Sequence, residues 1–386
     1  MKVRALSYLA FSLAMLMASC KKNNEPAPVF SFTAFSPSRG AVGSTIIITG
    51  TAFSVNATDN VVTFGTTSAI VTGATPTQLT VTVPAAAVSG KISISVNQVS
   101  LQSETDFIVA DRWEAMANIG GKRDYGFNFA VNGKGYVGAG SGSQKDFWEY
   151  DAANNVWTQK QDFKGEARVY STGFGVGSKG YVTAGYNSVM LKDVWEYDPT
   201  TNNWTQKNDF NSGERFAAIS FSIGSKGYVG TGSIIGSATS LKDFWEYDPA
   251  NDSWTKKADL PGEGRLYAFG FSIGTKGYVG GGVSRPGNVT QQTIYEYDAA
   301  LDRWTPKSNS PQDADFTFSS NSFVSATKGY VSGGVGKQLW QFDPVADAWL
   351  RKADPPAQAY GVGFTIGDYG YLGASYDKNF YRYIPE

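Results

Sequence analysis

Short apolar runs alternate with polar positions along most of the chain, and from about residue 111 they recur in a fixed order. A typical copy has a Gly-Tyr-Val segment, a glycine-rich turn, an aromatic-Glu-Tyr-Asp segment and a Trp. The anchoring tyrosines are Tyr136, Tyr181, Tyr228, Tyr278, Tyr330 and Tyr371. Their spacings of 45, 47, 50, 52 and 41 residues suit propeller blades of four β-strands each.

Fixed distances around each tyrosine indicate where the strands of a blade lie. A phenylalanine stands seven residues before the tyrosine in all six copies, at Phe129, Phe174, Phe221, Phe271, Phe323 and Phe364. In the first five copies a Trp comes nine residues after the first aromatic residue of the aromatic-Glu-Tyr segment. We therefore expect four strands per copy, which carry the Phe, the Gly-Tyr, the aromatic segment and the Trp in that order.

The two ends of the repeat region complete one another. The last copy stops at residues 380–386, which match a third strand, and no Trp strand follows it. The missing strand precedes the first copy, at residues 112–116. We expect these segments to pair, with Trp113 beside Tyr381 and Tyr383, since closure of the ring leaves no open sheet edge. The prediction is a propeller of six blades over residues 110–386.

Residues 29–109 show a second all-β pattern. Short β-branched runs at 46–48, 61–64, 79–83 and 92–96 are separated by Gly, Ser and Pro residues that mark turns. A segment of about 80 residues with this pattern suits a small immunoglobulin-like sandwich. We therefore expect an all-β protein, with an immunoglobulin-like β-sandwich first and the propeller after it.

Two family resemblances follow from these residues. Segments 37–40, 43–50 and 62–65 resemble the IPT/TIG domain, an immunoglobulin-like domain that usually serves as a spacer or interaction module in extracellular bacterial proteins. The glycine pair, the tyrosine and the Trp of each copy resemble the kelch motif, although the double glycine is complete only at 281–282 and 333–334. The resemblances imply an IPT/TIG spacer domain at 29–109 and a kelch-type six-bladed β-propeller at 110–386.

The N-terminus has the features of a targeting segment. Lys2 and Arg4 precede an apolar stretch at 5–17 that is too short to span a bilayer, and small residues stand before Cys20. This resembles the lipobox of bacterial lipoproteins; a short membrane anchor or a buried core segment is the alternative. We expect 1–19 to be a signal peptide, Cys20 to carry the lipid and 20–28 to form a tether. The protein would then be anchored in the bacterial envelope, in the outer membrane, and would contact the membrane only through its lipid.

Composition narrows the possible chemistry. The 386 residues carry a formal net charge of −1, which argues against a nucleic-acid partner. The sequence contains no histidine and one cysteine, so an internal disulfide, histidine-ligated metals and Ser-His-Asp catalysis are excluded. We assign no catalytic residues and expect neither a metal site nor a cofactor.

Candidate ligand-binding residues stand at the start of the innermost strands. Thirteen residues before the tyrosine, four copies have an arginine, and two residues further on, four copies have a tyrosine. The two sets are Arg123, Arg168, Arg215 and Arg265, and Tyr125, Tyr170, Tyr267 and Tyr360. Blade topology places both sets at one mouth of the central channel, where they could bind hydroxyl-rich or anionic ligands. The alternative is structural, because such arginines could pair with a nearby carboxylate or with a carbonyl of the adjacent blade.

These features favour a non-enzymatic binding protein that captures a carbohydrate or an envelope protein partner at the mouth of the propeller. Enzymatic activity stays open, since kelch-like propellers include a sugar mutarotase, which could use Glu and Arg in the channel. The copper oxidases among these propellers need histidines, which the sequence lacks. A structural scaffold within an envelope complex is a third alternative. Glu and Arg deep in the channel would favour the enzyme, and an exposed apolar rim would favour a protein partner.

Overall fold

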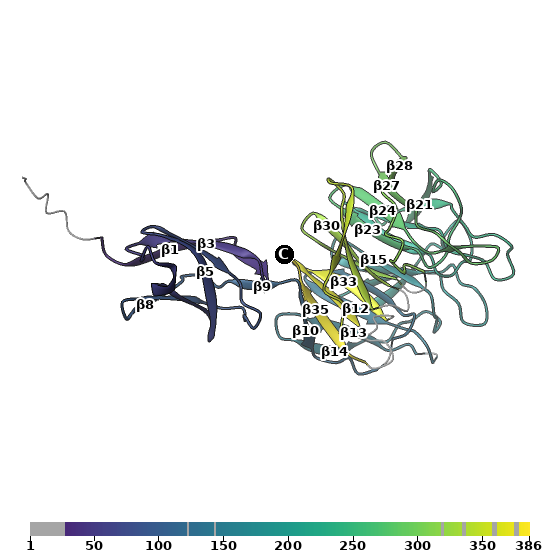
Figure 1. Cartoon of the computed structure of the whole chain (residues 1–386). Coiled ribbons are helices and arrows are strands. Elements are labelled where there is room, and N and C mark those ends of the chain that lie inside the picture. Colours follow the sequence, from purple (N-terminus) through teal and green to yellow (C-terminus); the bar gives the residue numbers. More distant parts are fainter. Residues whose placement is uncertain are drawn as a thin grey trace, which may run out of the picture.

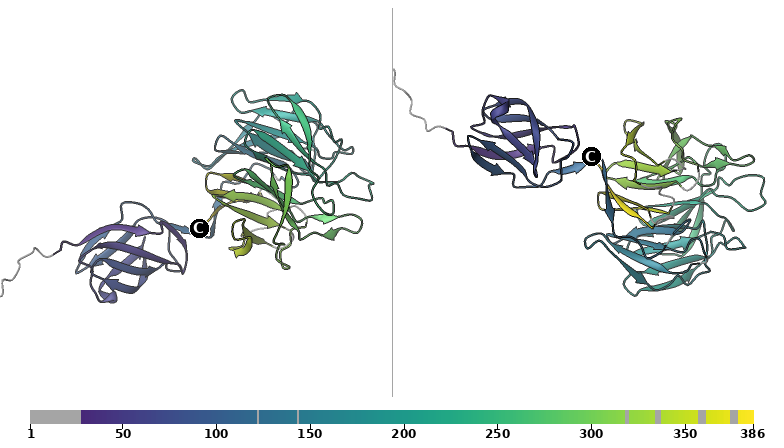
Figure 2. Two further views of the ribbon diagram at one scale, coloured as in Figure 1. Left: turned by 90° about the horizontal axis from the view of Figure 1, so that it is seen from above. Right: turned by 60° about the horizontal axis from the view of Figure 1, so that its bottom comes forward.

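The computed structural model describes residues 28–121, 123–142, 144–317, 320–333, 337–356, 361–373 and 378–386. Strands β1 to β35 and one 3-10 turn, η1 (Ala57–Asp59), make up the described secondary structure, so the predicted all-β fold is confirmed. A small sandwich and a larger propeller lie side by side, and the C-terminus lies between them in every view (Figure 1 and Figure 2). The predicted signal peptide and the predicted lipid attachment site, Cys20, lie outside the described residues.

The first domain is a β-sandwich. Its strands pair in the order β1-β3-β6-β5-β4-β7-β8, and a separate parallel pair joins β2 to β9. Alternation along each strand sends every second side chain into one apolar core, where Ile46, Ile48 and Val81 are fully buried. The bounds are β1 (Ser31–Ser36), β2 (Arg39–Ala41), β3 (Thr45–Thr51), β4 (Val61–Phe64), β5 (Thr67–Thr75), β6 (Gln78–Thr82), β7 (Ile92–Val96), β8 (Val99–Gln102) and β9 (Ile108–Ala110).

The second domain is a propeller of six four-stranded antiparallel sheets, as predicted. Blade 1 is β11 (Phe127–Val131), β12 (Lys134–Gly138), β13 (Phe147–Asp151) and β14 (Val156–Lys160). Blade 2 is β15 (Thr172–Val176), β16 (Lys179–Thr183), β17 (Val194–Asp198) and β18 (Asn203–Lys207). Blade 3 is β19 (Ile219–Ile223), β20 (Lys226–Gly230), β21 (Phe244–Asp248) and β22 (Ser253–Lys257).

The remaining three blades have the same order. Blade 4 is β23 (Phe269–Ile273), β24 (Lys276–Gly280), β27 (Ile294–Asp298) and β28 (Arg303–Lys307), with β25 (Val283–Ser284) and β26 (Val289–Thr290) as an extra hairpin. Blade 5 is β29 (Asn321–Ser325), β30 (Lys328–Gly333), β31 (Gln338–Asp343) and β32 (Ala348–Lys352). Blade 6 is β33 (Val362–Ile366), β34 (Tyr369–Gly373), β35 (Phe380–Ile384) and β10 (Arg112–Met116).

Each blade packs on the next through the phenylalanine of its inner strand. The ring of Phe129 in blade 1 covers Gly180 in the Gly-Tyr segment of blade 2, where a Cβ would overlap the ring. The same contact occurs around the whole ring: Phe129 with Gly180, Phe174 with Gly227, Phe221 with Gly277, Phe271 with Gly329, Phe323 with Gly370, and Phe364 with Gly135. The glycine is therefore required for close approach, and the buried tyrosine beside it fills the wedge between the blades.

Blade 6 is built from both ends of the repeat region, as the sequence predicts. Strand β10 pairs antiparallel with β35, so that Trp113 lies opposite Tyr383 and Ala115 lies opposite Tyr381. The rings of Trp113 and Tyr383 are 5.0 Å apart between centroids, and the Trp113 indole N–H donates to the Ala353 carbonyl oxygen at 2.7 Å. Side-chain packing and backbone pairing thus close the ring at the same place.

A short hydrogen-bonded segment joins the two domains. Arg112, at the start of β10, donates from Nη2 to Ser89 Oγ of the sandwich at 3.2 Å. Asp111 accepts hydrogen bonds from the Tyr383 hydroxyl at 2.6 Å and from the Ala353 backbone N–H at 3.0 Å. The sandwich is therefore attached to blade 6 by side chains as well as by the chain itself.

The two faces of the propeller differ in their connections. One face, which we name the hairpin face, carries the turns between the first and second strands and between the third and fourth strands of each blade. The other, the mouth face, carries the loops between the second and third strands, here called the 2–3 loops, and the crossings from blade to blade. Because Arg112 pairs with Ile384 at the hairpin face, the sandwich joins there, at the strand ends farthest from the mouth face.

The closure of the propeller by β10 predicts that Trp113→Ala lowers the free energy of unfolding by about 3 kcal/mol. The variant loses a large aromatic side chain that packs where blade 6 closes the ring. Chemical denaturation followed by circular dichroism measures this change. Leu350→Ala is the control, since Leu350 is 54 % exposed on the outer strand of blade 5 and its loss should cost no more than about 0.5 kcal/mol. Equal stabilities of the two variants would contradict the shared-blade closure.

Candidate functional site

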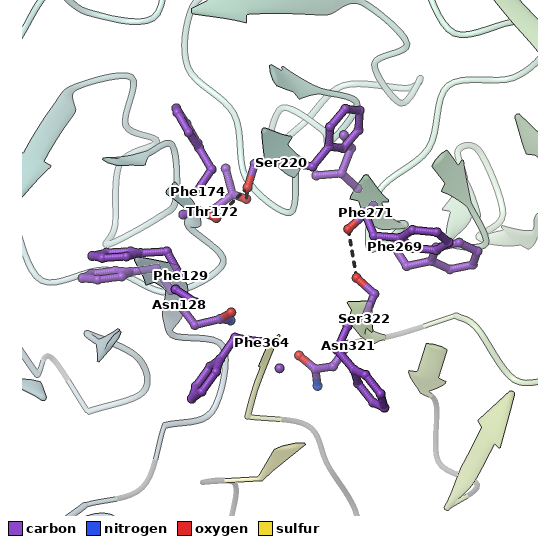
Figure 3. Close-up of a pocket in the computed structure, with 18 of the residues that line it drawn as sticks. Asn128, Phe129, Thr172, Phe174, Ser220, Phe269, Phe271, Asn321, Ser322 and Phe364 are labelled. Carbon is purple, nitrogen blue, oxygen red and sulfur yellow. Dashed lines mark hydrogen bonds between the residues drawn. The ribbon is translucent and has the colours of Figure 1, made fainter. Parts of the chain in front are cut away.

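The central channel is lined by small, uncharged side chains. Each inner strand turns its phenylalanine outward into the blade and turns the residues on either side of it toward the axis (Figure 3). The cavity has a volume of about 420 Å³. Its inward-facing positions include Asn128, Ser220, Ser222, Ser272, Ser322 and Thr365, together with several glycines. No Asp, Glu, Lys or Arg is found among the described residues that line it.

Hydroxyl groups in the channel join neighbouring blades. Ser272 donates to the Ser222 carbonyl oxygen at 2.7 Å, and Ser322, which is labelled in Figure 3, donates to the Gly270 carbonyl oxygen at 2.9 Å. Thr172 and Ser220 share a hydrogen bond of 2.5 Å between their hydroxyl oxygens. The polar channel wall is therefore itself part of the contact between inner strands.

At the mouth face, a series of backbone hydrogen bonds joins blades 1 to 4 along the edge of the channel. Tyr125, Tyr170, Ala217 and Tyr267 hold the same register in blades 1 to 4, and all four have positive φ, between 54° and 61°. In blades 2 to 4, the backbone N–H of each of these residues donates to the carbonyl oxygen of the equivalent residue in the preceding blade. The distances are 2.8 Å for Tyr170, 3.0 Å for Ala217 and 3.2 Å for Tyr267. This uncommon left-handed conformation turns the side chains toward the channel mouth. A second cavity of about 150 Å³ is lined by the same four residues.

The three described tyrosines of the predicted site form one aromatic group. Tyr125 and Tyr170 have ring centroids 4.5 Å apart, and Tyr170 meets Tyr267 at 5.5 Å. Tyr170 and Tyr267 come from blades 2 and 4, and the small Ala217 between them lets their rings meet. All three side chains are half-buried. Tyr360, the fourth tyrosine of the predicted set, lies outside the described residues.

The predicted arginines lie under the mouth rather than on it. Arg123, Arg168, Arg215 and Arg265 are at most 1 % exposed. Arg168 donates to both carboxylate oxygens of Asp193 at 2.7 Å and to the Ala184 carbonyl oxygen at 3.1 Å. Arg168 therefore has a structural role, which was the alternative to ligand binding. Its side chain links the segment that leads into blade 2 to the start of the third strand of that blade.

The same pairing recurs in two other blades. Arg215 binds both carboxylate oxygens of Asp243, at 2.8 and 2.7 Å, and Arg123 forms an ion pair with Asp146. Burial acts to raise the pKa of Asp243, but the hydrogen bonds and charge of Arg215 outweigh it, so that the pKa is lowered. The structure thus gives these arginines a role in the scaffold, and their contact with a ligand stays a prediction.

Blade 4 keeps the arginine but lacks its carboxylate. Thr293 occupies the position that is Asp in blades 1 to 3, and Arg265 donates to Thr293 Oγ1 at 2.9 Å and to its carbonyl oxygen at 3.0 Å. No described carboxylate forms an ion pair with Arg265. Burial lowers the pKa of Arg265 to about 10, which still leaves the side chain charged at neutral pH. Blade 4 therefore contains a buried cation that is not neutralised by a described acid.

Long 2–3 loops build a wall on one side of the mouth. The loops of blades 2, 3 and 4 touch one another: the Ile235 N–H contacts Met190 Sδ at 3.2 Å, and the Arg285 N–H donates to Ser240 Oγ at 3.0 Å. Phe216 and neighbouring side chains pack under these loops beside Tyr170 and Tyr267. Their outer edges carry exposed apolar side chains, at Val189, Ile234, Ile235 and Val289.

Sequence reasoning missed three groups at this site. The carboxylates Asp146, Asp193 and Asp243 stand two residues before the Trp of the third strand in blades 1 to 3, a recurrence that is visible in the sequence. The channel hydroxyls alternate with the inner-strand phenylalanine and could be found from the period of two. Arg285 lies in a loop that has no counterpart in the other copies, so no repeat signal points to it.

Two searches of the described residues found no further site. No group of three or more His, Cys, Asp or Glu side chains in the described ranges is arranged to hold a metal ion. No helix in that part of the chain is long and apolar enough to cross a membrane.

Comparison with known proteins places the first domain in a family. The family model of the IPT/TIG domain matches residues 31–109. The N-terminal sandwich is an IPT/TIG domain. This match covers the sandwich and leaves the propeller unassigned, and no curated protein sequence matches the chain.

Solved structures share the fold at low sequence identity. The structure of YjhT has a TM-score of 0.58 and 18 % identity, and the match covers 67 % of this chain and 92 % of that one. A structural genomics protein of unknown function from Bacteroides thetaiotaomicron VPI-5482 has a TM-score of 0.50 and 13 % identity, with 93 % of this chain and 99 % of that chain covered. At these identities the likeness concerns the fold alone.

The buried Arg265 cation of blade 4 predicts that Thr293→Asp raises the free energy of unfolding by about 1.5 kcal/mol, because a charged acceptor replaces the neutral threonine hydroxyl. Asp243→Thr, the reverse change in blade 3, should lower it by about 3 kcal/mol, since it leaves Arg215 buried without its partner. Urea denaturation measures both variants. Thr290→Asp, on the same loop but exposed, is the control and should change stability by less than about 0.5 kcal/mol. A Thr293→Asp variant less stable than this control would contradict the interpretation that Arg265 is a buried cation in need of an acidic partner.

Proposed function

We propose that this protein is a non-enzymatic binding protein of the bacterial envelope that captures a carbohydrate at the mouth of its propeller. The observation that carries the proposal is the group of half-buried tyrosine rings, Tyr125, Tyr170 and Tyr267, above a channel of hydroxyl and amide side chains. Sugar rings have apolar faces that pack on aromatic rings and hydroxyl edges that need hydrogen-bond partners. The mouth and the channel supply these two kinds of contact next to each other.

Burial and charge support a sugar over other small ligands. The channel walls carry no charged side chain among the described residues, so a neutral, hydroxyl-rich group can enter without leaving a charge unpaired. The tyrosine backbones are fixed by the three hydrogen bonds that join blades 1 to 4, which would reduce the entropy lost on binding. A preformed aromatic platform of this kind suits a glycan end or a short stretch of chain.

We further propose that the propeller is of the kelch type. The Gly-Tyr segment, the Trp strand and the closure by both ends of the repeat region support this assignment. The double glycine of the motif is incomplete in most copies, which leaves the Phe-on-Gly contact as the feature that all six blades share.

The proposed lipid anchor would determine which way the mouth face points relative to the membrane. Lipidation of Cys20 would hold the protein on the outer membrane through the tether at 20–28 and the IPT/TIG domain as a spacer. The sandwich joins the propeller at the hairpin face, so this arrangement would present the mouth face away from the attachment point. Capture of a glycan in front of the membrane is consistent with this geometry.

A protein partner is the second candidate, and one observation favours it. Val189, Ile235 and Val289 are 62 %, 52 % and 58 % exposed on the loops that form the wall of the mouth. Exposed apolar side chains that gather on one face are typical of protein-binding surfaces. In that case the partner would bind the exposed edges of these loops rather than the tyrosine rings at the channel mouth.

The mutarotase alternative has less support. Proton transfer to and from a sugar needs acid and base groups within hydrogen-bonding distance of the substrate. The described residues lining the channel and the mouth cavity include no Asp, Glu, Lys or Arg, and their only titratable groups are the tyrosine hydroxyls of the mouth. A mutarotase here would have to use a tyrosine of the mouth or residues outside these two cavities.

The carbohydrate proposal predicts that Tyr170→Ala weakens glycan binding about tenfold, or about 1.4 kcal/mol, because an aromatic face is lost. The fold should tolerate the change, since Ala217 holds the same register with φ of 54°. A glycan array identifies the probe, and calorimetric titration measures the affinity. Lys226→Ala on the hairpin face is the control, and its affinity should equal that of the parent protein. Unaltered affinity in a correctly folded Tyr170→Ala variant would exclude the tyrosine mouth as the binding site.

The lipid anchor predicts that Cys20→Ala stops both processing and partition into membranes. Fractionation of cells and mass determination of the mature protein measure these two properties. Cys20→Ser removes the thiol with the smallest change in shape and should behave like the alanine variant. A Cys20 variant that is still cleaved and still found with membranes would show that another segment anchors the protein.

A further inference from the structure

Arg285 lies beside the tyrosine rings of the mouth. It belongs to the connection between β25 and β26, and its guanidinium carbon is 5.8 Å from the centroid of the Phe216 ring. Phe216 in turn packs edge to face with Tyr170 at 5.9 Å and with Tyr267 at 6.3 Å. The Arg285 side chain is half-exposed, in contrast to the buried arginines of the scaffold. It is therefore accessible to a ligand that rests on the tyrosines.

No carboxylate of the described residues neutralises this cation, whereas Arg168 and Arg215 each hold an aspartate. Among the described residues, the side chain of Arg285 makes one hydrogen bond, from Nη1 to the Ile234 carbonyl oxygen at 3.3 Å. Its backbone N–H donates to Ser240 Oγ, which fixes the base of the side chain against the loop of blade 3. No described residue accepts from the other guanidinium donors, and their planar fork matches an oxyanion.

The positively charged side chains of blade 4 make its side of the channel mouth electropositive. Burial raises the pKa of Tyr267, and the positive charge of Arg285 opposes that rise, so the guanidinium acts on the tyrosine hydroxyl. Arg265 adds a second cation to the same blade without a described acidic partner. The described walls of the channel carry no charge of either sign. An anion at the mouth would therefore be attracted to the side formed by blade 4.

We propose that Arg285 binds an anionic group on the captured carbohydrate, so that the mouth selects acidic sugars over neutral ones. The inference rests on the proposed function, because it places the sugar ring on Tyr170 and Tyr267 and its oxyanion at the guanidinium. Carboxylate and sulfate both fit the donor fork. The shared chemistry is an oxyanion carried by a sugar ring that is otherwise rich in hydroxyl groups.

The test uses an array that holds matched glycans differing only in charge. The probes are chondroitin hexasaccharide, its carboxyl-reduced neutral form and its 6-O-sulfated form, with hexagalacturonate and its methyl ester as a second pair. Parent protein, Arg285→Gln, Arg285→Lys and Tyr170→Ala are compared, and calorimetric titration follows for the glycans retained. Arg303→Gln is the matched control, because it removes the same charge from an exposed position on the hairpin side of blade 4.

We expect the parent protein to bind an acidic glycan at least about tenfold more tightly than its neutral counterpart. Arg285→Gln should abolish that difference without changing the neutral affinity, Arg285→Lys should retain part of it, and Arg303→Gln should retain all of it. Raising the salt concentration should weaken the binding of the acidic glycan to the parent protein and leave its binding to Arg285→Gln nearly unchanged. A preference for the uronate or for the sulfated form identifies which oxyanion is bound.

Each contrary result has a distinct meaning. Equal binding of acidic and neutral glycans, with both weakened by Tyr170→Ala, overturns the role of Arg285 and leaves carbohydrate capture standing. An acidic preference that survives in Arg285→Gln also overturns it. Absence of binding to every glycan on the array overturns the proposed function, and the role of Arg285 with it. Melting curves of all variants separate loss of binding from loss of structure.

Discussion

The contact of one phenylalanine ring on one glycine is the constraint on which the propeller depends. In each blade the Gly-Tyr segment must come so close to the inner strand of the preceding blade that no Cβ fits between them. The contact recurs six times, and the step from Phe364 to Gly135 joins the last blade to the first. Because the wedge is filled by aromatic rings rather than by flexible chains, the angle between blades is fixed, and with it the width of the channel and the positions of the mouth residues.

Much of this fold could be predicted because the constraint repeats. The tyrosine spacing gives the blade count, the phenylalanine seven residues earlier marks the inner strand, and Trp113, ahead of the first copy, marks the strand that completes the last blade. The sandwich could be recognised from its β-branched runs, since each alternates with period two and buries one face. In both domains a local pattern coincided with a tertiary contact, which is the condition under which sequence reasoning succeeds.

The site was harder to predict because its decisive contacts are not periodic. Arginine at one register suggested a ligand, but the role of Arg168 depends on Asp193, which lies 25 residues later and on another strand. The tyrosines were found from their register, whereas the positive φ that aims them at the channel leaves no mark in the sequence. Arg285 belongs to a loop without counterparts, so only the folded chain shows that it lies over Phe216.

The shared blade also decides how the molecule carries a mechanical load. A pull on the N-terminal domain, opposed by a ligand held at the mouth, would enter the propeller at Arg112 and act along β10. That strand would have to slide past β35, so that the backbone pairs from Arg112 with Ile384 to Met116 with Phe380 would resist together rather than open one by one. Trp113, which packs against Tyr383, would have to leave its wedge in the same motion. The seam that closes the ring is thus also its tension-bearing element.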